Sequence, residues 1–202
     1  LRTRATDVAA TAGLTYTFTS GDRVNLNGRY ADQGQTEYDT VDQYPIASGV
    51  ESYRGRFANV RVFTRDVWEL GGDYEHAFDN GDVLNALFVY NLSYDRDDRI
   101  FYHTPPGAPQ ITDRLQRQVP DRSERILRAS YRWGVAPNQW LEFGGEAAIN
   151  TLNQKVSAFT FNGTTPQQVA VPNAVADVDE KRFEGFTTYT WQPQPAFQID
   201  GG

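Results

Sequence analysis

The chain has 202 residues with a formal net charge of −7, and it contains no Cys and no Met. Without Cys it can form no disulfide framework, zinc ribbon, iron–sulfur cluster or thiol nucleophile. Its 19 Lys and Arg against 26 Asp and Glu, with no basic cluster, argue against a nucleic-acid partner, because such binding rests on neutralising phosphates. The longest apolar stretch, Val83 to Leu92, is too short for a membrane helix and is interrupted by Asn85 and Asn91.

Taken in chain order, nearly every regular segment repeats its hydrophobic residues with a period of two, which predicts β-strands. The first run alternates from Val8 to Phe18, and no segment shows the period of a helix. The predicted strands cover residues 8–18, 24–30, 68–78, 84–94, 127–133, 141–149 and 183–191, with a shortened last strand from 197.

Two kinds of connection alternate between these strands. Short turns fall near residues 21, 81, 137 and 194, and Asn80-Gly81 between two alternating runs is a strong hairpin signal. Long polar segments at 32–60, 95–122 and 151–179 are expected to be loops on the opposite rim. An alternative is that 54–64 extends the strand that begins at Trp68. The pattern predicts an all-β, antiparallel up-and-down meander of about eight long strands.

Strand length and composition favour a membrane over water. The runs of about ten to twelve residues suit membrane strands, which need about 9 to 11, better than soluble strands of about 5 to 6. Aromatic residues are expected to cap the apolar face beside the short turns, as in the girdles of outer-membrane barrels: Phe18, Phe78, Trp133, Trp140, Tyr189, Trp191 and Phe197. The opposite face carries charges of both signs, as a wet lumen would. We therefore expect part of a transmembrane β-barrel.

Four segments resemble the middle of the barrel of a TonB-dependent outer-membrane receptor. They are 68–75 (WELGGDYE), 123–131 (SERILRASY), 141–152 (LEFGGEAAINTL) and 182–186 (RFEGF). The resemblance implies a 22-stranded barrel in the bacterial outer membrane, closed by an N-terminal plug. It further implies uptake of a scarce ligand such as an iron chelate, vitamin or sugar, with energy delivered through TonB.

The chain departs from that family pattern in length and content. It is too short for 22 strands, shows no plug or TonB box, and does not end in a strand with a terminal aromatic residue. Residues 1–202 are therefore expected to be a single barrel segment of a larger protein, and Leu1 is not expected to be a native start. Two alternatives stay open. One is a self-closed eight-stranded outer-membrane barrel, and the other is a soluble, carbohydrate-binding type of module that uses Tyr102, Phe159 and Phe161.

A search for chemistry yields no catalytic residue, no metal site, no cofactor and no identified ligand-binding residue. His76 is expected on the apolar face and His103 in a loop, too far apart for a histidine metal site. The acidic stretches 95–99 and 177–180 are expected to be solvated loop charges. Glu142 and Glu146 share one strand face about 13 Å apart, which is too far for a glycosidase pair. The expected partners are membrane lipid, a small ligand, and TonB through a plug outside this chain.

Overall fold

The computed structural model describes residues 1–47 and 49–202, and this part of the chain is all-β. The strands are β1 (Arg2–Thr17), β2 (Arg23–Gln43), β3 (Ile46–Ala47), β4 (Val50–Glu51), β5 (Gly55–Ala77), β6 (Val83–Thr104), β7 (Ile111–Ala136), β8 (Gln139–Asn162), β9 (Thr165–Val169), β10 (Val175–Gln194) and β11 (Phe197–Gly201). Among the described residues, no helix is both long and apolar enough to span a bilayer.

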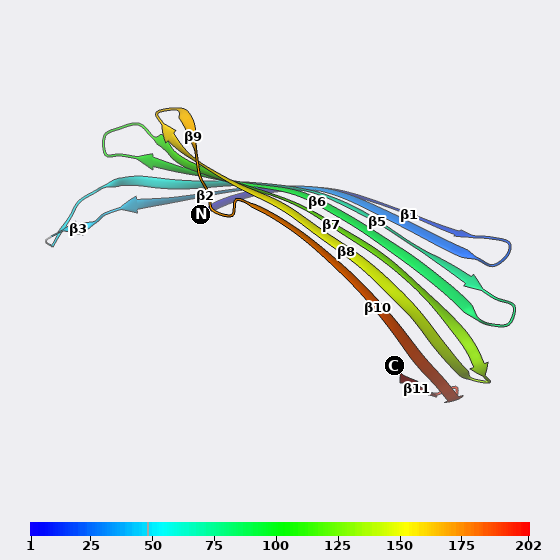
Figure 1. Ribbon diagram of the computed structural model, residues 1–202. Helices are drawn as coiled ribbons and strands as arrows, with labels where there is room; N and C mark the ends of the chain where they lie inside the picture. The colour runs from blue at the N-terminus through cyan, green and yellow to red at the C-terminus, as the bar shows by residue number, and fades with distance from the viewer. Residues whose placement is uncertain (48) are drawn as a thin grey trace.

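The strands form one antiparallel sheet in the order β1-β2-β5-β6-β7-β8-β10-β11, with β9 paired to β8 and a separate β3–β4 hairpin. Each strand lies beside the next long strand of the chain, so the predicted up-and-down meander is confirmed. The sheet is a single curved layer with its short turns gathered at one end (Figure 1). It is open, because β1 pairs with β2 but with neither β10 nor β11 in the described residues.

The long strands continue through most of the segments expected to be loops, so that expectation was wrong. β2 runs to Gln43, β6 to Thr104 and β8 to Asn162, and β5 begins at Gly55, which confirms the alternative for 54–64. His103 and both acidic stretches lie in strands rather than in loops. The apolar signal fades in these extensions because polar residues are frequent on both of their faces, as expected where both faces meet water.

The first two hairpins share one turn. In each, the backbone N–H of a glycine donates to the carbonyl of the phenylalanine three residues earlier: Gly21 to Phe18, and Gly81 to Phe78, both 2.9 Å. Gly21 and Gly81 have φ of 89° and 87°, as a three-residue loop with a left-handed third residue requires. The sequence pattern Phe-x-x-Gly-Asp, present at 18–22 and 78–82, therefore encodes this turn.

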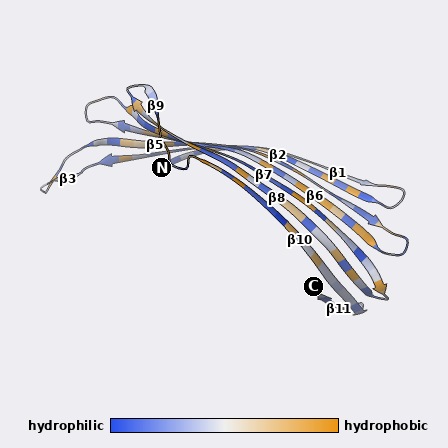
Figure 2. Cartoon of the chain, viewed as in Figure 1, coloured by the Kyte–Doolittle hydropathy of each residue, from blue (hydrophilic) through white to orange (hydrophobic). Residues whose placement is uncertain are grey.

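The sheet has almost no apolar core. The only hydrophobic residues that are buried among those described are Ala31, Ala58 and Ala148. The sheet is therefore held by its backbone ladders, which run without interruption for 21 residue pairs between β2 and β5. Hydropathy alternates along the strands because successive side chains point to opposite faces (Figure 2).

The ladders step regularly from hairpin to hairpin. One row of paired residues crosses six strands: Asp32, Asp66, Tyr94, Asp121, Asn153 and Asp177. Measured from the centres of the four short turns, at residues 20, 80, 137 and 195, this row lies 12, 14, 16 and 18 residues along the chain. The stagger is thus one residue per strand. With a rise of about 3.3 Å and a strand spacing of about 4.8 Å, it tilts the strands by about 35°, the tilt that closed barrels require.

We expect close approach of neighbours to make Gly144 necessary. A Cβ atom there would lie 2.5 Å from the Ala129 carbonyl oxygen and 2.6 Å from the Phe186 ring. Gly144→Ala should lower the free energy of unfolding by about 1–3 kcal/mol through this overpacking. Gly185→Ala is the matched control, because its nearest contact would be 3.9 Å away. Urea unfolding of the folded protein measures both, and equal midpoints for the two variants would contradict the prediction.

Candidate functional site

The sheet presents two faces of opposite character, and these are the candidate functional surfaces. The apolar face carries large hydrophobic side chains that are between 38% and 75% exposed: Val8, Leu14, Leu26, Trp68, Leu70, Leu127, Phe143, Phe183 and Tyr189. The register places all of them on one side of the sheet, because their rows pair across the strands. No second layer covers them (Figure 1).

The apolar face forms a band beside the short turns. In each long strand the first charged residue on this face lies 12 to 18 residues from the turn centre: Arg4, Asp32, Asp66, Arg96, Arg125, Lys155 and Lys181. About ten residues per strand are free of charge. At a tilt of about 35° they span about 27 Å perpendicular to the rim of turns. The upper limit of the band keeps its distance from the turns although the paired rows step away from them.

Aromatic residues line both edges of the band. Beside the turns lie Tyr16, Phe18, Phe78, Tyr131, Trp133, Trp191 and Phe197, which agrees with the predicted girdle except at Trp140. Trp140 pairs with Gly134 and Thr190 on the polar face, where the Arg132 guanidinium lies 6.0 Å from its ring centroid. The reason is an irregular ladder between Gly134 and Ala136. At the far edge Tyr30 and Trp68 pack with ring centroids 4.5 Å apart, a feature that sequence reasoning missed.

Each short turn is hydrogen-bonded to the next hairpin by a repeated contact. Asp82 accepts hydrogen bonds from the Tyr131 hydroxyl (2.6 Å) and from the Gly134 backbone N–H (2.9 Å). Gln139 accepts one from the Tyr189 hydroxyl at 2.6 Å.

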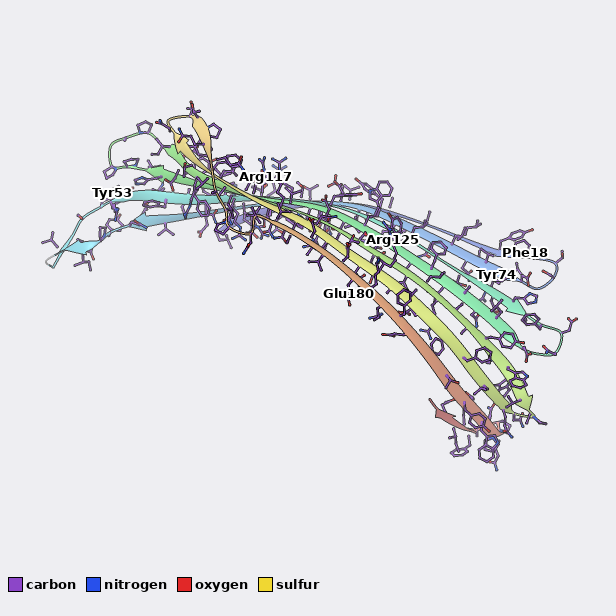
Figure 3. The ribbon with its side chains drawn as sticks, viewed as in Figure 1. Phe18, Tyr53, Tyr74, Arg117, Arg125 and Glu180 are labelled. Carbon is purple, nitrogen blue, oxygen red and sulfur yellow. The ribbon has the colours of Figure 1, made fainter. Side chains whose placement is uncertain are left out.

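The first turn makes the equivalent contact through Asp22, which contacts His76 and the Tyr74 hydroxyl. Figure 3 shows Tyr74 and Phe18 at this end of the sheet. The signal for this repeat is Tyr-x-His or Tyr-x-Trp at 74–76, 131–133 and 189–191. The constant stagger brings each of these tyrosines to the residue that follows the preceding turn.

The polar face carries ion pairs and amide contacts at the same level as the apolar band. Arg29 Nη1 lies 3.0 Å from Glu69 Oε1, and Arg182 Nη2 lies 2.9 Å from Glu146 Oε1. One row alternates carboxylates and amides across five strands: Glu69, Asn91, Glu124, Asn150 and Glu180. Within it the Asn91 amide donates to Glu124 at 2.8 Å. Together with aliphatic neighbours, this row lines a shallow hollow of 440 Å³.

The most enclosed charges lie on the polar face farther from the turns. The Asp95 side chain is only 2% exposed, and its carboxylate lies 2.8 Å from Arg65 Nη2 and 2.6 Å from Arg122 Nη1. On the apolar side of the extensions, Asp98 pairs with Arg117 at 2.7 Å and Arg96 at 2.8 Å. Burial opposes ionisation of Asp98, but hydrogen bonds from the two arginines outweigh it and hold its pKa below the ordinary range.

The residues singled out in the sequence do not converge. His76 lies on the apolar face as expected, whereas His103 stacks on Phe57 on the polar face, 4.3 Å between centroids. Glu146 pairs with Arg182, and Glu142 lies four residues before it on β8. In the described part of the chain no three His, Cys, Asp or Glu side chains gather in a way that could hold a metal ion. Tyr102 (β6) and Phe159 (β8) share one side of the sheet but are separated by β7.

Comparison with protein-family models, with curated proteins and with solved structures finds no match to this chain.

The contact between Asp82 and Tyr131 should make the rim of turns sensitive to acid. Hydrogen bonds from Tyr131 and from the Gly134 N–H hold the pKa of Asp82 below the ordinary aspartate value of about 3.9. Stability from this contact is therefore complete above about pH 4 and is lost as the pH falls through the lowered pKa. Asp82→Asn should lower the unfolding midpoint at pH 7 and reduce the further loss on acidification. Asp79→Asn, an exposed change in the same turn, is the control, and an identical acid profile for all three proteins would refute this.

We also expect the enclosed carboxylate of Asp95 to stabilise the extended strands. Asp95→Asn removes a charged acceptor and leaves Arg65 and Arg122 without it, which should reduce the free energy of unfolding by about 1–3 kcal/mol. Asp113→Asn in β7 is the comparison, because Asp113 is exposed and makes no recorded ion pair. Equilibrium unfolding followed by circular dichroism tests this, and a shift in Asp113→Asn as large as in Asp95→Asn would contradict it.

Proposed function

We propose that this chain forms part of the barrel wall of a TonB-dependent outer-membrane receptor that takes up a scarce ligand such as an iron chelate, vitamin or sugar. Its apolar face would meet outer-membrane lipid and its polar face would line the lumen. The chain would act as a passive wall, without catalysis or cofactor. A plug outside this chain would connect the receptor to TonB.

The observation that carries the proposal is the height and slope of the apolar band. A band of about 27 Å agrees with the roughly 25 Å outward-facing band of outer-membrane barrels, which also have aromatic girdles at both edges and strands tilted by about 35–45°. The band runs parallel to the rim of turns and oblique to the paired rows. A membrane imposes this relation, because its plane ignores the tilt of individual strands.

The open edges favour a larger barrel over a self-closed one. β1 offers unpaired backbone groups along Arg2–Thr17, and the Val175–Thr188 part of β10 pairs with β8 alone in the described structure. Unpaired backbone groups are costly in a bilayer, so these edges need further strands. The assignment to the TonB-dependent class rests on the resemblance of 68–75, 123–131, 141–152 and 182–186 to strands of such receptors.

The polar face suits a wet interior where ligand would pass. Charges of both signs, such as Arg29 with Glu69, lie directly behind the band, where lipid would not tolerate them. A soluble sandwich would instead pack a second layer on the apolar face, and it would not leave residues such as Phe183 75% exposed.

Arginine substitutions on neighbouring residues of β6 test which face meets lipid. Phe88 lies on the apolar face near the middle of the band, and Leu87 lies on the polar face between Asp73 and Arg128. Phe88→Arg should lower folding stability in a bilayer by about 2–4 kcal/mol, the cost of a cation at the midplane. Leu87→Arg should cost much less because its side chain would reach water and Asp73.

The measurement is urea unfolding of the protein folded into phosphatidylcholine vesicles, followed by tryptophan fluorescence. Equal losses in the two variants would contradict a lipid-facing apolar side. A protein that stays monomeric and folded at high concentration in plain buffer would overturn the membrane proposal altogether.

A further inference from the structure

Two cations stand on the apolar face at the upper limit of the band. Arg125 and Lys181 belong to one paired row, Tyr90–Arg125–Ile149–Lys181, so they lie on either side of Ile149. Arg125 is 12 residues from its turn centre, the same distance as Trp68 and Ile149 from theirs. It therefore occupies a level at which neighbouring strands present apolar side chains.

Neither cation has a carboxylate partner within 4.0 Å in the described part of the chain. The contrast with the adjacent residue is direct, since Arg182 on the polar face pairs with Glu146 at 2.9 Å and with Glu184 at 3.1 Å. The Arg125 guanidinium lies instead 5.5 Å from the centroid of the Tyr90 ring. Figure 3 labels Arg125 and Glu180, which the register assigns to opposite faces.

Hydroxyl groups and apolar side chains complete the surroundings. In the next row outward, Ser123 Oγ and Thr151 Oγ1 are hydrogen-bonded at 2.7 Å, and Asp179 beside Lys181 is the only acid of these two rows on this part of the face. In the row below lie Leu127 and Phe183, which are 61% and 75% exposed. Cations and hydroxyls thus stand directly above an apolar surface.

We propose that Arg125 and Lys181, with the Ser123 and Thr151 hydroxyls, bind the phosphate of a membrane lipid headgroup whose acyl chains lie on Leu127 and Phe183. This inference rests on the proposed function, because it requires the band to face lipid. A guanidinium and an ammonium attract phosphate more strongly at the edge of a bilayer than in water. Two strand spacings separate the two backbones by about 10 Å, so both long side chains reach one headgroup.

The test compares anionic with zwitterionic lipid. The protein is folded into phosphatidylcholine bilayers with trace spin-labelled phosphatidylglycerol or phosphatidylcholine, and electron paramagnetic resonance measures the relative association of each with the protein. Phosphatidylglycerol should be preferred by about fivefold or more, since each cation near the surface contributes about that factor. In Arg125→Ala/Lys181→Ala the preference should fall at least threefold.

The matched control is Arg128→Ala/Arg182→Ala, which removes two cations from the polar face of the same strands, β7 and β10. It should keep the preference of the unchanged protein. An undiminished preference in Arg125→Ala/Lys181→Ala, or an equal loss in the control, overturns this inference while leaving the barrel intact. Absence of any protein-associated lipid signal, with either label, overturns the proposed membrane function itself.

Discussion

Backbone hydrogen bonding between staggered strands is the interaction on which everything else in this molecule depends. With only Ala31, Ala58 and Ala148 buried as hydrophobic residues, packing contributes little, and the ladders alone hold the single layer together. The stagger of one residue per strand then determines the tilt, the alignment of the turns and the level at which each side chain stands. Without this regular step, neither the apolar band nor the rim contacts would exist.

The same stagger couples neighbouring hairpins at their turns. Each tyrosine at 74, 131 and 189 meets the polar residue that follows the preceding turn, at 22, 82 and 139. A shift by one residue would move every side chain to the other face and break these contacts. The repeated contacts therefore oppose register errors in a sheet that has no core to correct them. Their place at the edge of the band also suits tyrosine, which has an apolar ring and a polar tip.

The two faces need different surroundings, and that need links the fold to the proposed receptor wall. On the polar face, charges are neutralised locally, as where Asp95 meets Arg65 and Arg122. On the apolar face, the band lacks any covering layer, so its neighbours must come from outside the chain. A bilayer supplies apolar neighbours along the band and phosphates at its edge, where Arg125 and Lys181 stand without protein partners.

The sequence by itself determined the all-β meander, the positions of the turns and the apolar face, because the period of two and the Phe-x-x-Gly-Asp turns are local signals. It did not predict the strands through 32–43, 95–104 and 151–162, since polar residues on both faces erase the alternation there. It also placed Trp140 on the wrong face, because an irregular ladder after Gly134 is invisible in a periodic pattern. Only the tertiary structure decided the stagger, the pairing of Asp95 and the isolation of Arg125, because each depends on which residues of different strands stand opposite one another.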